Sequence, residues 1–301
     1  MGASAPAPLG GFMSINMVEA EIRHTLDKLS NNEAVEIDEQ WIDDAAEQFK
    51  QAMKKQFLQQ EDQGGFRLRM SNIGRPLCQL QMEKSGAPKA RRPYNHIIRM
   101  AIGDATECIM EIVLRAAGLN VTGGKSKVEL PIGPAKIKGE DDIEIDHRVW
   151  DTKSASPWAF TNKWADGTEG LRKSDDFGYL AQLTGYSRGQ GKDPGGWFVV
   201  NKSTGEVAAV QSDLTDEEMN KILSDVEQKV VALENDEPFQ RCFEAEEETY
   251  YRKPTGSMRL PTPCTFCDFM KTCWPDAVHK PQTNSTAQKP KYYWYAEYAG
   301  D

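Results

Sequence analysis

The stretch Gly139-Glu-Asp-Asp142, followed by Asp151-Thr-Lys153, predicts most about this chain of 301 residues. Asp151 and Lys153 are two residues apart, so on a strand their side chains share one face. We expect Asp142 to lie on the preceding strand, across a short turn. Carboxylate oxygens are the ligands that Mg²⁺ and Mn²⁺ prefer. The grouping therefore predicts a site for a divalent cation beside a phosphodiester. The alternative is a solvated acidic hairpin, because acidic residues are mostly exposed.

The composition is that of a globular protein with 27% charged and 39% hydrophobic residues. The length fits one large α/β domain or two small ones. The net charge of −10 argues against a protein coated in nucleic acid, but it allows a local basic groove. No apolar run is long enough to cross a membrane.

The first residues and the cysteines both bear on the compartment in which the protein is found. Residues 1–11 are small and uncharged and lack the pattern of a secretory signal, so we expect a flexible arm. Six cysteines without such a signal indicate a reducing compartment, in which clustered cysteines more often bind metal than form disulfides. We expect a cytoplasmic protein, or one of the host cytoplasm if the source is viral.

Hydrophobic periodicity and turn residues predict an α/β fold with a central mixed β-sheet flanked by helices. Asp213 or Thr215 is expected to cap the last long helix. The expected helices cover residues 13–30, 38–60, 95–117, 175–187 and 216–234. The expected strands cover residues 126–132, 136–145, 148–154, 197–201 and 206–211. The expected divisions are a helical cap (12–63), a core (64–250), a C-terminal cysteine segment (251–280) and a polar tail (281–301).

Three further side chains are placed to join the acidic pair. Glu107 lies on the helix before the strands, and its carboxylate is suited to a hard metal. Gln182 and Tyr186 are four residues apart on a later helix and share a face, where they can position a phosphate or a water. Each has an ordinary alternative: Glu107 can be a surface acid, Gln182 a surface glutamine and Tyr186 a core tyrosine.

A basic segment precedes this region and is a candidate contact for the phosphates of a nucleic acid. The alternative is an ordinary basic loop, since short charge runs are common on surfaces. The candidate nucleic-acid contacts are Arg75, Lys84, Lys89, Arg91 and Arg92.

The motifs Gly103-x₃-Glu107, Gly139-x₂-Asp142, Asp151-x-Lys153 and Gln182-x₃-Tyr186 occur in this order over residues ~95–190. This order resembles the RecB-like branch of the PD-(D/E)XK nucleases. The resemblance implies a restriction-endonuclease-like core that uses Mg²⁺ or Mn²⁺.

The same resemblance implies a role for each residue of the motifs. Asp142 and Asp151 are then metal ligands, with Glu107 and the backbone carbonyl of Thr152 as further ligands. Lys153 positions or deprotonates the attacking water, or offsets charge on the phosphate. Gln182 and Tyr186 correspond to the downstream motif of the family. Many members carry histidine where this chain has Glu107, so the role of Glu107 is the least certain part of the match.

The cysteines predict a second metal site. Cys264-x₂-Cys267-x₅-Cys273 supplies three thiolates and needs a fourth ligand, for which Cys78 and Cys242 compete. One cysteine before the core and three after it is similar to the CRISPR-associated RecB-like exonucleases and to the nuclease domain of AddB. That resemblance implies a [4Fe–4S] cluster held by Cys78, Cys264, Cys267 and Cys273, with zinc as the alternative. We expect Cys108 to be a core residue.

The sequence thus favours a metal-dependent DNA exonuclease acting in recombination, repair or phage replication. An endonuclease or a CRISPR spacer-processing nuclease of the same fold is an alternative. A non-catalytic Fe–S or zinc subunit that binds nucleic acid is an alternative of another class. The chain has no G-x-x-x-x-G-K-[ST] loop, so unwinding would need a helicase partner. A polymerase or a single-strand-binding protein is a further candidate partner, and the chain can form an oligomer.

Two aromatic groups remain open at the level of sequence. Trp158, Phe160 and Trp164 either stack on unpaired bases or belong to the core. The run Tyr292-Tyr-Trp-Tyr295 either docks on a partner or packs on the protein's own surface.

Overall fold

The computed structural model describes residues 14–58 and 65–300. The fold is mixed, with about 42% helix and 22% strand, and its sheets are flanked by helices as expected. The predicted arm of residues 1–11 lies outside the described residues. Within the described part of the chain, no helix is both long and apolar enough to cross a membrane.

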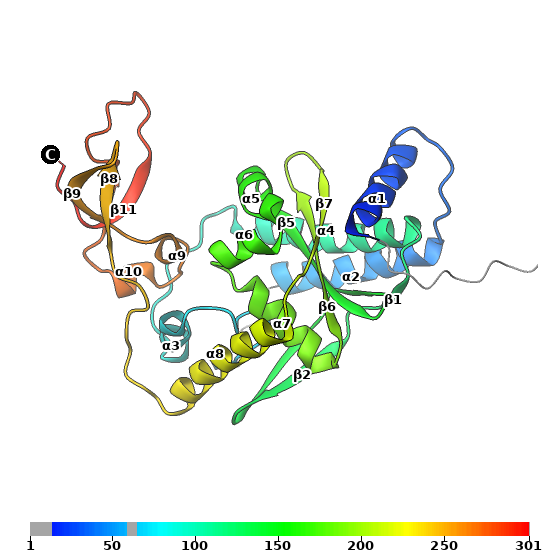
Figure 1. The fold of residues 1–301 in the computed structure, drawn as a ribbon, viewed down its shortest axis with the longest axis horizontal. Coiled ribbons are helices and arrows are strands. Elements are labelled where there is room, and N and C mark those ends of the chain that lie inside the picture. Colours follow the sequence, from blue (N-terminus) through cyan, green and yellow to red (C-terminus); the bar gives the residue numbers. More distant parts are fainter. Residues whose placement is uncertain (1–13, 59–64, 301) are drawn as a thin grey trace, which may run out of the picture.

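The centre of the molecule is a five-stranded sheet in the order β1-β4-β5-β6-β7 (Figure 1). β5 and β6 are parallel, and the other neighbouring strands are antiparallel. The sheet is therefore mixed, as predicted. Its strands are β1 (Val121–Gly123), β4 (Ile143–Ile145), β5 (Arg148–Ala155), β6 (Asp193–Asn201) and β7 (Val207–Gln211).

The two faces of this sheet bury two separate hydrophobic clusters, because successive side chains of a strand point to opposite faces. On β6, Trp197 and Val199 belong to the cluster that includes α7 and α8. Phe198, between them, belongs to the cluster that includes α1 and α4. α2 covers α4. The long helices are α1 (Ile15–Ser30), α2 (Glu39–Phe57), α4 (His96–Ala116), α7 (Tyr179–Gln190) and α8 (Asp216–Glu234).

The connection between the parallel strands β5 and β6 is helical, as a parallel pair requires. It consists of α5 (Pro157–Asn162), the 3₁₀ turn η1 (Trp164–Asp166), α6 (Thr168–Lys173) and α7. The predicted helix 175–187 begins later than expected. Gly178 has a left-handed φ of 78°, and the carboxylate of Asp175 accepts hydrogen bonds from the N–H groups of Tyr179 and Leu180, so the helix begins at Tyr179.

The predicted single strand 136–145 is also wrong, since the structure divides it between two sheets. β3 (Ala135–Glu140) pairs with β2 (Lys127–Ile132) in a separate hairpin, and β4 pairs with β5. Between them, the Asp141 carboxylate accepts hydrogen bonds from the Ser126 N–H and from Gln190 Nε2. Asp142 therefore lies in the break between two strands and not on a strand.

The chain ends in a second sheet of four strands in the order β10-β11-β9-β8. Within residues 281–301, which the sequence predicts to form a tail, β11 is an internal strand of this sheet. Its Tyr295 is buried, and the Tyr295 hydroxyl donates a hydrogen bond to Glu248 Oε1 at 2.7 Å. The strands are β8 (Glu246–Tyr250), β9 (Lys253–Arg259), β10 (Val278–Pro281) and β11 (Tyr292–Glu297).

Three short helices complete the described part of the chain. α9 (Thr262–Thr265) and α10 (Met270–Cys273) lie between β9 and β10, and α3 (Leu77–Lys84) precedes α4. Figure 1 shows α3 and the α9–α10 region between the central sheet and the C-terminal sheet. Cysteine-bearing segments that are far apart in the sequence are thus brought to one region.

Candidate functional site

Five charged side chains from four parts of the chain meet beside β5, the middle strand of the central sheet. Asp151 and Lys153 come from β5, and Lys153 Nζ lies 2.5 Å from Asp151 Oδ2. Glu107 comes from α4, and Asp142 comes from the break before β4. Lys125, in the turn after β1, lies 3.0 Å from Glu107 and 3.6 Å from Asp142. The predicted acidic pair, lysine and helix glutamate are therefore brought together.

The site is largely withdrawn from solvent. The Asp151 residue is only 2% exposed, and the Lys153 side chain is 18% exposed. The backbone N–H of Thr152 donates a hydrogen bond of 2.9 Å to Asp142 Oδ2, which ties the break to β5. This arrangement excludes the solvated acidic hairpin that the sequence left open.

Burial and neighbouring charges shift the pKa values of the three carboxyl groups in different directions. Burial raises the pKa of Asp151 well above its ordinary value, although Lys153 opposes the shift. Burial and the charge of Asp142 likewise raise the pKa of Glu107. Burial also opposes ionisation of Asp142, but Lys153, Lys125 and the Thr152 N–H outweigh it and hold the Asp142 pKa below its usual range.

The two lysines stay protonated because of these carboxylates. Burial disfavours the Lys153 ammonium, yet the charges of Asp151 and Asp142 raise its pKa above the ordinary value. The pKa of Lys125 is raised in the same way by Asp142 and Glu107. Sequence reasoning missed Lys125, since a lysine in a glycine turn carries no local signal for such a position.

Tyr186 and Gln182 of α7 lie close to these charges. Burial and the charges of Asp142 and Asp151 raise the pKa of the Tyr186 phenol, and Gln182 hydrogen-bonds to it. The backbone of Gly139 comes so near that a Cβ there would be 2.9 Å from the Tyr186 ring. The predicted motif glycine thus allows the strand before Asp142 to approach α7.

The carboxylates fit a hard divalent cation by the chemistry of their donor atoms. In the described residues, no three histidine, cysteine, aspartate or glutamate side chains are arranged as a ready metal-binding group. Lys125 and Lys153 instead neutralise part of the negative charge. The Thr152 side chain is buried, and the part of Thr152 seen to act at the site is its N–H group.

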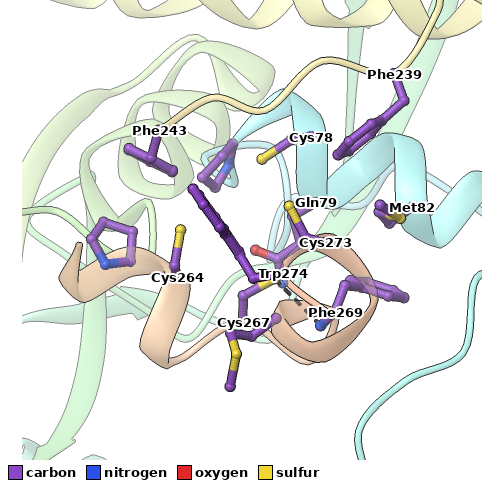
Figure 2. A pocket seen from close by; sticks show the side chains of 13 residues that line it. Cys78, Gln79, Met82, Phe239, Phe243, Cys264, Cys267, Phe269, Cys273 and Trp274 are labelled. Carbon is purple, nitrogen blue, oxygen red and sulfur yellow. Dashed lines mark hydrogen bonds between the residues drawn. The ribbon is translucent and has the colours of Figure 1, made fainter. Parts of the chain in front are cut away.

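The predicted cysteine ligands lie around one pocket, although no three of them form a ready metal-binding group in the described residues. Cys78 from α3 and the cysteines of the α9–α10 segment line one pocket (Figure 2). Trp274 lies among them in the same view. Burial raises the pKa of the Cys264 thiol to about 11, and the nearby Cys273 and Cys267 thiols contribute to the shift. Thiolates around one pocket are a donor set suited to Fe–S or zinc.

Cys242 lies beside this group. Its Sγ accepts a hydrogen bond from the backbone N–H of Cys78 at 3.1 Å, and the interaction with Cys78 lowers the Cys242 pKa to about 6. The neighbouring Arg241 donates to the Cys273 carbonyl at 2.8 Å and lies 4.0 Å from the Trp274 ring. Cys78 therefore lines the pocket and Cys242 lies against Cys78, whereas Cys108 is buried in α4 as expected.

The predicted basic contacts fall into two groups. Lys84 is used within the chain, since it bonds to the Leu233 carbonyl and to Asp236 at the end of α8. Lys89 pairs with Glu83 at 2.8 Å. Arg75, Arg91 and Arg92 keep much of their surface in solvent, and Arg75 and Arg92 make only long ion pairs of 3.9 Å.

The aromatic residues for which the sequence left two alternatives differ in their exposure to solvent. Trp164 is buried and Phe160 packs against the core, whereas Trp158 is 69% exposed. In the C-terminal run, Tyr295 is buried and Trp294 packs against the cluster around Cys264, so this run packs on the protein itself.

Comparison of the chain with models of protein families and with curated proteins found no match. The geometry above is therefore the basis on which a function can be argued.

Proposed function

We propose that this protein is a metal-dependent deoxyribonuclease with a restriction-endonuclease-like core, and that it acts as an exonuclease on DNA ends. One observation carries the proposal. Asp151 and Lys153 form an ion pair in a largely buried site, the Thr152 N–H between them donates to Asp142, and Lys125 joins Asp142 to Glu107. Buried titratable groups with shifted pKa values are typical of catalytic sites.

Glu107, Asp142 and Asp151 would hold one or two Mg²⁺ or Mn²⁺ ions, together with the carbonyl of Thr152. A divalent cation in such a site supplies Lewis-acid stabilisation of the phosphate and activates water for attack. Asp142 is the carboxylate already held in its ionised form, by Lys153, Lys125 and the Thr152 N–H. Burial raises the pKa values of Asp151 and Glu107, and a bound cation would oppose this shift because it favours the ionised carboxylates.

Lys153 acts in this proposal as a fixed positive charge and not as a base. Its raised pKa keeps the ammonium protonated near neutral pH. An ammonium held in a dry site stabilises negative charge that develops on a phosphate far better than one in water. Tyr186 stays a neutral hydrogen-bond donor, oriented by Gln182.

The cysteine pocket is proposed to hold a structural [4Fe–4S] cluster through Cys78, Cys264, Cys267 and Cys273, with zinc as the alternative metal. Its chemistry would be thiolate ligation that joins α3 to the C-terminal segment. Trp274 and Arg241 would support the ligand segment through the contacts described above.

The test is cleavage of end-labelled linear DNA and of a covalently closed circle, each in Mg²⁺ and in Mn²⁺. We expect Asp151→Asn to reduce cleavage of linear DNA by on the order of 10²-fold or more, because a ligand and a charge partner of Lys153 are lost. Glu144→Gln is the matched control. Glu144 is a buried carboxylate of the same stretch, but it pairs with Lys192 and Thr122 away from the site.

Three results separate the alternatives. Cleavage of linear DNA alone supports an exonuclease, and the labelled end gives its polarity. Cutting of the closed circle would favour an endonuclease instead. Undiminished cleavage by Asp151→Asn in folded protein would exclude this site, and binding without any cleavage by the wild type would indicate a non-catalytic subunit.

A further inference from the structure

A row of three aromatic rings leads from the proposed catalytic site to the cysteine segment. Lys153 Nζ lies 5.3 Å from the centroid of the Tyr179 ring. The Phe177 ring follows, with its centroid 5.7 Å from that of Tyr179, and the Phe266 ring is 6.0 Å from Phe177. We call Tyr179, Phe177 and Phe266 the aromatic row.

The outer part of this row is open to solvent. Phe177 is 50% exposed and Phe266 is 64% exposed, although both are large apolar residues. A single exposed apolar side chain needs no explanation, but adjoining exposed rings beside a proposed active site mark a binding surface. Tyr179 is the inner member and is largely covered, so the row becomes more open with distance from Lys153.

Buried polar groups hold the inner rings in place. Lys163 is only 8% exposed, and its Nζ lies 5.6 Å from the Tyr179 centroid and 5.8 Å from the Phe177 centroid. A cation over an aromatic face attracts the ring electrostatically. The Asp175 carboxylate fixes the backbone of Tyr179 through a hydrogen bond of 2.8 Å. The rings are therefore prearranged for a ligand.

Basic residues lie along the outer part of the row. Arg75 follows Gly74, whose backbone touches Gly178 next to Phe177: a Cβ on Gly74 would lie 2.3 Å from Gly178 Cα. The basic segment also contacts Asp268, two residues after Phe266. The Ala90 N–H donates to the Asp268 carbonyl at 2.6 Å, and Arg92 lies 3.9 Å from the Asp268 carboxylate. Aromatic rings flanked by arginines complement a ligand with flat bases and phosphates.

We infer that the aromatic row is a stacking path for the bases of single-stranded DNA on their way to Lys153. The inference rests on the proposed nuclease function and names its substrate as an unpaired strand. Stacking is independent of base identity, because every base has an aromatic face. Duplex DNA keeps its bases stacked on one another, so it offers no free base faces to the row.

The inference also gives the cysteine segment a part in substrate binding. Phe266 stands between Cys264 and Cys267 in the sequence, so whatever holds these cysteines also positions the outermost ring. The path is thus built from two places, the start of α7 with the residues just before it, and the turn after α9.

The experiment measures binding of a fluorescein-labelled oligothymidylate by fluorescence anisotropy. The Asp151→Asn protein is used with its full chain and cysteine-bound metal and with no divalent cation added, so that cleavage cannot interfere. In this background we expect Phe177→Ala and Phe266→Ala each to weaken single-strand binding by about tenfold, the amount that loss of one stacked base implies. Phe266→Trp should restore it. A blunt duplex of the same length should bind equally well to all variants.

The matched control is Tyr251→Ala. Tyr251 is 83% exposed in the turn between β8 and β9, away from the row, and its loss should leave single-strand binding unchanged. Metal analysis of each variant shows whether its iron or zinc is retained.

The outcomes separate the inference from the function on which it rests. Unchanged oligothymidylate binding by the double variant Phe177→Ala/Phe266→Ala would overturn the stacking path, while cleavage by the wild type would leave the nuclease proposal intact. Equal weakening of single-strand and duplex binding would overturn the assignment to unpaired strands. Weak single-strand binding supports the path when the same ring substitutions, made in protein that keeps Asp151, slow cleavage only at low substrate concentration, since this shows a loss of substrate binding and not of chemistry.

Discussion

At the scale of single residues, the site is a charge balance of three carboxyl groups and two ammonium groups. Lys153 lies against Asp151, and Lys125 lies between Glu107 and Asp142. Burying one charge without a partner is costly, whereas paired and hydrogen-bonded charges can be tolerated. Lys125 is therefore part of what allows Glu107 and Asp142 to lie close together.

Replacing Lys125 tests this balance. We expect Lys125→Gln to destabilise the protein by about 1–3 kcal/mol in the absence of divalent cations, because two acidic side chains lose their shared partner. The same change should enlarge the increase in melting temperature on adding Mn²⁺, since the site has become more negative. Thermal unfolding with and without Mn²⁺ measures both effects.

Lys127→Gln provides the control, because Lys127 is an exposed lysine two residues further along the chain. A smaller Mn²⁺ effect in Lys125→Gln than in wild type would show that the ammonium helps to build the cation site instead of competing with the cation for its ligands.

At the scale of elements, one backbone contact sets where α7 begins. Gly74, in the loop before α3, and Gly178, at the start of α7, approach so closely that neither has room for a side chain. Gly178 also has a left-handed φ of 78°, a conformation that glycine adopts without strain. This contact positions Phe177 and, one and two turns later, Gln182 and Tyr186.

A methyl group at Gly74 should therefore be disruptive. We expect Gly74→Ala to cost about 1–3 kcal/mol, the range for forced overpacking, and to lower the melting temperature by roughly 2–4 °C for each kcal/mol. Gly65→Ala is the control, because nothing lies within 4 Å of a Cβ at Gly65. Equal melting temperatures of the two variants would show that the Gly74–Gly178 contact does not constrain the fold.

The elements also show where local sequence suffices. α8 covers Asp216–Glu234 as predicted, and Thr215 is its cap, with Glu218 completing a capping box. The stripe of Ile15, Val18, Ile22 and Leu26 on α1 packs on the sheet as its spacing predicts. In contrast, nothing local marks the division of residues 136–145, because it depends on Gln190 and Ser126 bonding to Asp141.

At the scale of the whole molecule, the C-terminal sheet is joined to the core through the cysteine pocket and a few bonds around it. The Thr272 hydroxyl donates to the Pro88 carbonyl at 2.9 Å, and the Ala90 N–H donates to Asp268. The segment between α8 and β8 runs past α3, where Gln81 bonds to the carbonyls of Glu237 and Pro238.

Loss of one ligand should loosen this connection. We expect Cys273→Ala protein to lose its bound iron or zinc and to be cut by trypsin between α8 and β8 faster than wild type, because metal ligation no longer ties the C-terminal segment to α3. Metal analysis and the mass of the fragments are the measurements. Cys108→Ala, which removes a buried thiol of α4 outside the pocket, should keep both the metal and the resistance. Full metal content in Cys273→Ala would show that Cys242 can serve as the fourth ligand.

The sequence by itself determined the fold class, most of the long elements and most members of both candidate sites, Lys125 excepted. These follow from short-range causes: periodicity selects helix or strand, and Asp151 and Lys153 share a face because a strand alternates. Only the tertiary structure decided which charges meet. It placed Lys125 between Glu107 and Asp142, put Asp142 in a break between sheets, and set Phe177 beside Phe266. The physical reason is that burial and Coulomb energy depend on distance in space, and residues far apart in the chain acquire that distance only when the two sheets and their helices have packed.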